Sequence, residues 1–187
     1  MREDKIRWNE KYRSQSAPER PSELLVRHIG LLENRRVLDI AAGMGRHAAF
    51  LARHGCRVDA LEWSDEALRR LRTIEGVETY EVDLDIGELP QRKYGGILCF
   101  YYLNRRLFPM IVDRLEPGGV LLFETYVANE RNEGAPSNPD FLLKKGELPE
   151  TFSDLEILEY TEKLTKREDG RTAMLASLVA RKSFLEV

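Results

Sequence analysis

The sequence contains little of what several protein classes require. Its 187 residues include only two cysteines, Cys56 and Cys99, far apart in the chain. This argues against a disulfide framework or a cysteine-rich zinc site, and it fits a reducing cytosol. No apolar run approaches the roughly 20 residues of a membrane-spanning helix, and the N-terminal Met-Arg-Glu-Asp-Lys does not resemble a signal peptide. We therefore expect a cytoplasmic protein that does not contact membranes.

A strong charge of either sign is also missing. The 29 lysines and arginines are nearly balanced by 32 acidic residues, which leaves a formal net charge of -3. Such a chain has no general attraction for nucleic acid, so we expect no nucleic-acid partner. The length and the apolar fraction of 42% predict a single domain over residues 1–187. No pattern indicates an oligomeric state.

The most informative stretch covers residues 37–47, Val-Leu-Asp-Ile-Ala-Ala-Gly-Met-Gly-Arg-His. It predicts a buried strand, a turn of small residues and a helix that begins at Arg46. Such a unit brings backbone N–H groups and a helix N-terminus to a ligand. Asp39 would repel a pyrophosphate, but it suits a cationic or hydroxyl-bearing ligand. The stretch therefore favours S-adenosylmethionine (SAM) over a dinucleotide.

Strands and helices alternate along the chain. Five strands are predicted at residues 36–41, 58–62, 78–82, 96–102 and 120–126, with a tight turn at 116–119 before the last. This alternation is typical of a three-layer, doubly wound α/β fold with a parallel sheet. Asp169-Gly170 predicts an antiparallel hairpin between residues 155–164 and 172–181. Acids stand at the ends of the first three strands: Asp39, Glu62 and Asp83. They should converge at the carboxyl edge of the sheet, where such folds bind ligands, although strand-end acids can also cap helices or face solvent.

Several motifs resemble class I SAM-dependent methyltransferases. Residues 37–45 are similar to the first motif of that family, with Ala41 in place of its first glycine. Val82-Asp83-Leu84 resembles the adenine-contacting motif, and residues 115–119 resemble a late motif; Gly95 stands where the family often has Asp. Residues 8–13, 102–105 and 138–143 are similar to tellurite-resistance (TehB-like) and thiopurine-methyltransferase-like enzymes. The resemblance implies a Rossmann-like methyltransferase fold: seven strands, mostly parallel, with a C-terminal antiparallel hairpin.

The resemblance also implies how SAM would be held. Asp39 would meet the methionine ammonium, Glu62 the ribose hydroxyls, and Asp83 the adenine amino group beside the Leu84 N–H. Trp63 either stacks on adenine or packs under a helix, and Phe100 either reaches the cofactor or stays in the core. The full implied set is Asp39, Ala41, Gly43, Gly45, Glu62, Trp63, Asp83, Leu84 and Phe100.

The methyl acceptor is expected to be a small molecule. Its pocket would be formed by the N-terminal arm (1–20), the loop at 127–146, which has the length of a lid, and Trp8, Tyr12, Tyr101, Tyr102 and Arg105. No catalytic residue and no metal site is identified. Methyl transfer from a sulfonium depends mainly on alignment, and a soft thiol or chalcogen nucleophile needs no base. The alternatives are an RNA or protein methyltransferase, a dinucleotide-dependent oxidoreductase, and a SAM-binding protein without turnover.

Overall fold

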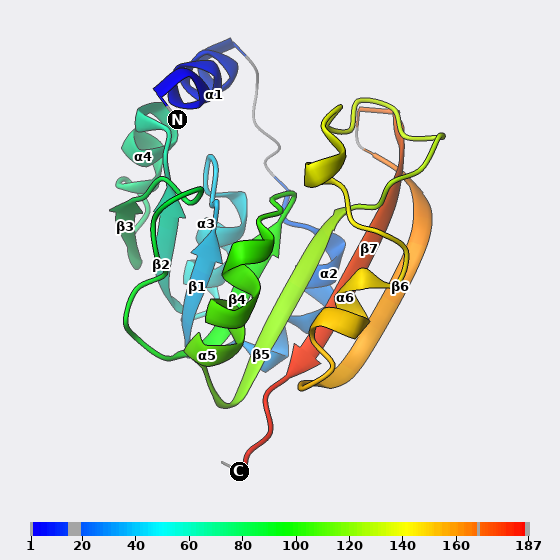
Figure 1. Ribbon diagram of the computed structural model, residues 1–187. Helices are drawn as coiled ribbons and strands as arrows, with labels where there is room; N and C mark the ends of the chain where they lie inside the picture. Colours follow the sequence, from blue (N-terminus) through cyan, green and yellow to red (C-terminus); the bar gives the residue numbers. More distant parts are fainter. Residues whose placement is uncertain (1, 15–19, 168, 186–187) are drawn as a thin grey trace.

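The computed structural model describes residues 2–14, 20–167 and 169–185. Within them, one sheet of seven strands has the order β3-β2-β1-β4-β5-β7-β6 (Figure 1). The strands are β1 (Arg36–Ile40), β2 (Arg57–Glu62), β3 (Val77–Glu81), β4 (Tyr94–Phe100), β5 (Leu115–Tyr126), β6 (Glu156–Lys166) and β7 (Thr172–Arg181). β1 to β5 pair in parallel, and β7 lies antiparallel to both β5 and β6. The predicted α/β fold with its C-terminal antiparallel hairpin is confirmed.

Helices cover both faces of the sheet. One face carries α2 (Glu23–His28), α3 (Arg46–Arg53) and α4 (Asp65–Leu71), which pack apolar side chains on Val37, Ala60 and other strand residues. The opposite face carries α5 (Phe108–Arg114) and α6 (Glu147–Thr151). Successive strand residues point to opposite faces, and both faces are covered, so the inner strands are apolar throughout.

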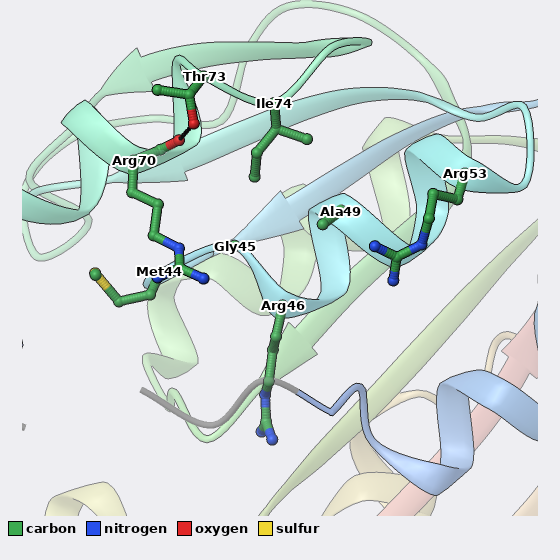
Figure 2. Close-up of a pocket in the computed structure, with 8 residues that line it drawn as sticks. All are labelled: Met44, Gly45, Arg46, Ala49, Arg53, Arg70, Thr73 and Ile74. Carbon is green, nitrogen blue, oxygen red and sulfur yellow. Dashed lines mark hydrogen bonds between the residues drawn. The ribbon is translucent and has the colours of Figure 1, made fainter. Parts of the chain in front are cut away.

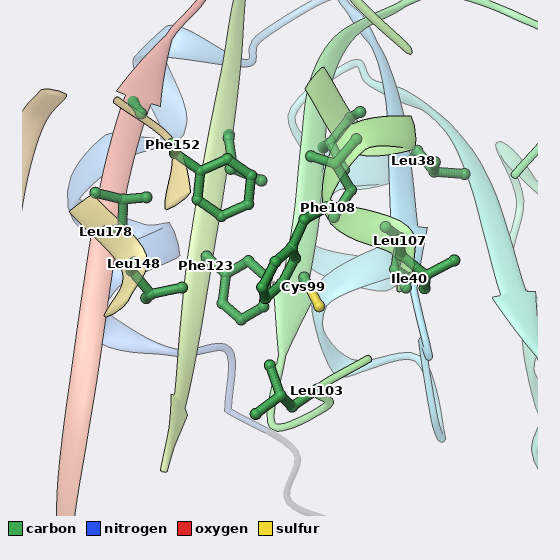
Figure 3. Close-up of a cluster of buried hydrophobic side chains, with 14 of the residues drawn as sticks. Leu38, Ile40, Cys99, Leu103, Leu107, Phe108, Phe123, Leu148, Phe152 and Leu178 are labelled. Carbon is green, nitrogen blue, oxygen red and sulfur yellow. The ribbon is translucent and has the colours of Figure 1, made fainter. Parts of the chain in front are cut away.

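The hydrophobic core between the sheet and helices α5 and α6 is built around aromatic rings (Figure 3). Phe108, Phe123 and Phe152 come from α5, β5 and the end of α6, and their ring centroids lie 5.3–6.0 Å apart. Tilted and edge-on pairs at this separation stabilise a core beyond simple burial. These contacts join the parallel part of the sheet to the C-terminal segment that forms the hairpin.

Several predicted boundaries were wrong. The fourth strand, expected at 96–102, spans Tyr94–Phe100, because Tyr101 has a φ of +56° and leaves the strand. The first strand ends at Ile40, since Ala41 has a φ of +56° and starts the turn. The tight turn expected at 116–119 is instead part of β5: the pairing passes from Tyr94↔Leu115 to Gly96↔Val120, so additional β5 residues bulge out. Gly118, at φ +73°, donates its N–H to the Lys182 carbonyl, which ties this bulge to the chain after β7.

The described part of the N-terminal arm is a helix, α1 (Arg2–Ser14), which lies against α4. Lys5 pairs with Asp65 and Glu81, and Asn9 accepts a hydrogen bond from the Ser64 hydroxyl. Residues 1 and 15–19 of the predicted arm lie outside the described residues. None of the described helices has the length and apolar character needed to cross a membrane.

The loop after β5 is mostly irregular, as predicted. It contains a 3-10 turn, η3 (Pro139–Phe141), and an isolated bridge between Val127 and Leu143. Asn138 caps the turn by accepting from the Asp140 N–H. Arg105, from the 3-10 turn η2 (Arg105–Leu107) before α5, pairs with Glu147 and donates to the carbonyls of Asp140 and Leu142. These contacts fix the loop against the parallel half of the sheet.

A buried carboxylate on β2 yields a stability test. Asp59 is fully buried; it pairs with Arg36 and Arg92 and accepts the Tyr94 hydroxyl at 2.8 Å. Replacing it with Ala would leave the buried Tyr94 hydroxyl and Arg92 without this partner, and Arg36 with only its longer ion pair to Glu78. We expect Asp59→Ala to cost about 3 kcal/mol in the free energy of unfolding, measured by urea denaturation. A cost below about 0.5 kcal/mol would contradict a structural role for this cluster.

Candidate cofactor and acceptor site

Asp39 is a buried acid without a partner at the carboxyl end of β1. It is 1% exposed, and its Oδ2 atom has no hydrogen-bond partner among the described residues. Burial, and then the negative charge of Glu62, raise the pKa of Asp39 to about 7. A buried polar atom without a partner is costly. The site is therefore suited to a ligand that brings a cation or a donor to Asp39.

Glu62, the last residue of β2, holds the glycine turn in place. Its Oε2 accepts the Gly43 N–H at 2.7 Å, and its Oε1 accepts the N–H groups of Trp63 and Ser64 at 2.8 Å each. Burial raises the pKa of Glu62, while these backbone hydrogen bonds oppose the rise. The carboxyl group thus connects the turn after β1 to the start of α4, with the second lone pair of Oε2 left for a ligand.

The turn itself uses left-handed backbone at three of five positions. Ala41, Gly43 and Gly45 have φ values of +56°, +56° and +84°. This explains the expected glycine at position 41, because alanine is strained in that region. A Cβ on Gly43 would lie 3.1 Å from the Tyr12 hydroxyl oxygen, so α1 covers the turn closely. A Cβ on Gly45 would lie 2.8 Å from Leu71, so this glycine lets α3 pack against α4.

The predicted adenine residues line the next two strand ends. Trp63 has a buried Nε1 without a partner, and Lys5 Nζ lies 4.7 Å from its ring centroid. Asp83 is half-buried; its Oδ1 accepts the Asp85 N–H, while no described residue bonds its Oδ2. The Leu84 carbonyl accepts hydrogen bonds from Asn104 and Arg106. These contacts fix the segment after β3 in the position where it was expected to meet a base.

Phe100 belongs to a packed network behind the turn. It is 6% exposed, and its ring centroid is 4.4 Å from that of His47. Burial, and then the charge of Arg46, lower the pKa of His47 to about 3, so the imidazole is neutral. Its Nε2 accepts the Ser22 N–H at 3.1 Å. His47 is therefore a neutral, packed side chain that supports the turn.

Two neighbouring aromatic rings, each contacted by an arginine, lie beyond the end of β4. The Arg46 guanidinium is 5.6 Å from the Tyr101 ring, Tyr101 is 5.6 Å from Tyr126, and the Arg167 guanidinium is 5.6 Å from Tyr126. Tyr101 was expected here. Tyr126 and Arg167 were missed, because nothing in the sequence shows that the ends of β5 and β6 meet there. We call these four residues the aromatic wall.

Arg167 has an unsatisfied buried donor. Its side chain is 26% exposed, and its Nη2 lies 3.6 Å from Asp169 Oδ2 in an ion pair, but its Nη1 has no hydrogen-bond partner among the described residues. Lys11 on α1 lies within electrostatic range: its pKa is lowered by burial and then by the charges of Arg167, Arg7 and Arg171. Lysine and arginine side chains from α1 and the β6–β7 hairpin therefore meet at the Arg167 end of the aromatic wall, where Asp169 pairs with Arg167 and Arg171.

The other predicted acceptor residues differ in their surroundings. Trp8 and Tyr12 stack with centroids 5.6 Å apart, and Tyr12 is largely buried over Gly43. The Tyr102 hydroxyl donates to Asp85, in the segment after β3. Arg105 is fully engaged by the 127–146 loop, as described above, so its contacts order that loop.

A groove of about 630 Å³ adjoins the glycine turn, whose Met44 and Gly45 line one end of it (Figure 2). It runs between α3 and the chain after α4, and none of the strand-end acids lines it. Figure 2 shows the Arg46 side chain directed away from Arg70 and Thr73. The groove is lined by Met44, Gly45, Arg46, Ala49, Arg53, Arg70, Thr73 and Ile74.

The residues at the strand ends fit SAM. Asp39 Oδ2 requires a donor, which an ammonium supplies, and the Trp63 N–H requires an acceptor, which a purine or ribose supplies. Between Asp39 and Trp63, Glu62 offers an acceptor oxygen, and the glycine turn offers its backbone. A pyrophosphate would face the two acids, so the arrangement disfavours a dinucleotide.

Solved structures define the class. A SAM-dependent methyltransferase from Methanosarcina mazei has a TM-score of 0.69 at 16% identity over 89% of this chain and 100% of that one. A Burkholderia thailandensis 1,6-didemethyltoxoflavin-N1-methyltransferase with bound S-adenosylhomocysteine (SAH) has a TM-score of 0.69 at 19% identity, covering 97% and 87%. The fold is that of the SAM-dependent methyltransferases. No curated protein sequence matches the chain.

The family follows from a more specific match. The model of the family "Tellurite resistance protein TehB" matches residues 5–173, and the chain belongs to this family. The structure of TehB from Haemophilus influenzae has a TM-score of 0.74 at 20% identity over 94% of this chain. This chain spans 66% of that protein. Fold and family place it among the SAM-dependent methyltransferases, as the sequence motifs predicted.

The raised pKa of Asp39 gives a stability test. The folded protein holds this proton more tightly than the unfolded chain, whose carboxyl titrates near 3.8. The stabilisation is therefore present below about pH 4 and is lost as the pH rises through about 7. We expect Asp39→Asn to raise the melting temperature of the ligand-free protein by at least about 4 °C at about pH 8, and by little at about pH 4. If the variant and the unaltered protein differ in melting temperature by the same amount at both pH values, the raised pKa of Asp39 is contradicted.

Proposed function

We propose that the protein transfers the methyl group of SAM to a small anionic acceptor whose nucleophile is a soft thiolate or chalcogen anion. The observation that carries the acceptor half of this proposal is the unpartnered, buried Nη1 of Arg167, a member of the aromatic wall. The donor half rests on the unpartnered Asp39 and Trp63 atoms at the strand ends. The two halves lie on either side of Tyr101.

Charge supports an anionic acceptor. The whole chain has a formal net charge of -3, yet cations from three elements, Lys11, Arg46 and Arg167, gather at the site. Such a local concentration attracts anions from solution and lowers the free energy of an anion that has lost its water. Arg167 is suited to contact an oxyanion or a thiolate because its guanidinium has several fixed donors.

The surroundings of the site support a small acceptor molecule. Tyr12 covers the glycine turn, and the 127–146 loop packs Ala135 and Leu142 against the Tyr126 cluster. The related toxoflavin methyltransferase holds a small heterocyclic substrate together with SAH. Both observations favour a small molecule over a macromolecule.

Methyl transfer to such an acceptor requires little from the protein beyond aligning the acceptor with the methyl group of SAM. SAM supplies a methyl group on a cationic sulfur, and the products would be the methylated acceptor and SAH as the carbon–sulfur bond breaks. An anionic soft nucleophile needs no proton removed. Burial, and then Glu124, raise the pKa of Tyr101, so the phenol stays neutral and does not act as a base. The residues contribute by orienting the two reactants and excluding water.

Calorimetry with SAM and SAH tests the donor half. Ionised Asp39 attracts the ammonium of both ligands, so their affinity should rise between about pH 6 and pH 8 as this acid ionises. Asp39→Asn should weaken both ligands by roughly tenfold to a hundredfold at about pH 8. If the unaltered protein binds neither SAM nor SAH, the proposed function is refuted.

Labelled SAM with a panel of thiols, selenite, tellurite and neutral amines tests the acceptor half. We expect methyl transfer to the anions, and Arg167→Gln should raise the KM of the best acceptor roughly tenfold while the Kd of SAM is unchanged. Arg70→Gln is the matched control, because it removes the same charge from α4, and Arg70 is not part of the aromatic wall. Preference for a neutral amine, or equal effects of the two variants, would reject an anionic acceptor held by Arg167.

A further inference from the structure

Glu124 on β5 is a buried carboxyl group that the proposed chemistry leaves without a role. It is 9% exposed, and no described residue forms an ion pair with it. Instead, three hydroxyl groups donate to it: Ser22 and Tyr101 to Oε1 at 3.1 and 3.0 Å, and Ser177 to Oε2 at 2.7 Å. The group thus joins α2, the end of β4 and β7 at one point.

Glu124 holds Tyr101 at both ends. The Tyr101 hydroxyl donates to its side chain, and the Tyr101 backbone N–H donates to its carbonyl at 2.8 Å. Between these contacts Tyr101 has a φ of +56°, a left-handed conformation that strains a residue with a side chain. Backbone strain persists where the surrounding contacts over-determine it. The position of this ring is therefore imposed by Glu124.

The direction of the Tyr101 proton follows from the chemistry of its partner. A carboxylate only accepts hydrogen bonds, so the phenolic proton must point toward Glu124. The remaining lone pairs of the phenolic oxygen then face away from Glu124. Toward any ligand, this oxygen is an acceptor and never a donor.

The fold places Tyr101 at the edge of the sheet that carries the proposed donor site. Tyr101 directly follows β4, which pairs with β1 through Asp39↔Leu98 and Ile40↔Cys99. Arg46, the first residue of α3 after the glycine turn, lies over the Tyr101 ring. On its other side the ring contacts Tyr126 of the aromatic wall. Tyr101 therefore stands between the donor half and the acceptor half of the site.

We propose that Glu124 is a positioning residue that fixes the Tyr101 hydroxyl as an acceptor for the polarised methyl group of SAM, which allows the site to distinguish SAM from SAH. The inference rests on the proposed function. A methyl on a cationic sulfur is a C–H donor, and SAH lacks it. One contact of this kind is worth roughly a threefold to fivefold difference in affinity.

The test is the ratio of the Kd of SAH to the Kd of SAM, measured by calorimetry. Tyr101→Phe removes the acceptor oxygen, and Glu124→Ala releases the hydroxyl; each should lower the ratio about threefold to fivefold, mainly through weaker SAM binding. Glu124→Gln should keep most of the ratio, because its amide oxygen can accept from Tyr101 while its NH₂ group faces Ser177. Ser177→Ala is the matched control: it removes another hydroxyl from Glu124 and should leave the ratio unchanged.

The SAH affinity reports whether each variant is folded, since SAH should bind all of them nearly equally. If Glu124→Ala does not fold, Tyr101→Phe and Glu124→Gln still decide. An unchanged ratio in Tyr101→Phe, equal weakening of both ligands, or a change in Ser177→Ala as large as in Glu124→Ala would overturn the inference. An unaltered protein that binds both ligands while the variants fail this test would refute only the inference. One that binds neither would refute the proposed function and the inference with it.

Discussion

The structure of the site depends on the Glu62 carboxyl group and the three backbone N–H groups that it accepts. These bonds determine the path of the turn after β1 and the start of α4 together, so neither can shift alone. The consequence is electrostatic as well as geometric. Backbone N–H groups satisfy Glu62, but its negative charge still acts on its neighbour Asp39, whose Oδ2 remains buried and without a partner among the described residues. Asp59, a buried acid on the same sheet, is instead paired with two arginines that compensate its charge. Asp59 therefore stabilises the fold, whereas Asp39 is left available for a ligand.

The architecture could be predicted from the sequence to a large extent because it depends on local patterns. Apolar strands, capping residues such as Ser64 and the glycine turn each encode a local conformation, and their alternation permits few topologies. The acids at three strand ends followed from the same logic, since parallel strands bring their carboxyl ends to one edge. The errors were also local: the bulge at 116–119 has the composition of a turn, and its strand pairing depends on the backbone after β7.

The acceptor half could not be predicted in the same way. Tyr126 ends an apolar strand and Arg167 stands before a hairpin turn; 41 positions separate them, and neither belongs to a motif. They meet because β7 is inserted between β5 and β6, which is a property of the whole sheet. Glu124 was missed for a related reason. A single acid in a strand normally indicates a solvent-facing position, and only the convergence of α2, β4 and β7 shows that three hydroxyls surround it.

The attachment of α1 has a consequence for how the protein responds to its ionic surroundings. Ile6 and Trp8 are partly exposed, and the contacts of α1 with α4 and β3 are ion pairs and polar hydrogen bonds, such as those of Lys5, Asn9 and Arg13. Such surface pairs weaken as salt shortens the Debye length, whereas burial of the two apolar cores does not. Ionic strength therefore acts selectively on the helix that carries Tyr12 over the turn. The rate at which ligands enter and leave the donor half should increase with salt, while the sheet beneath keeps its shape.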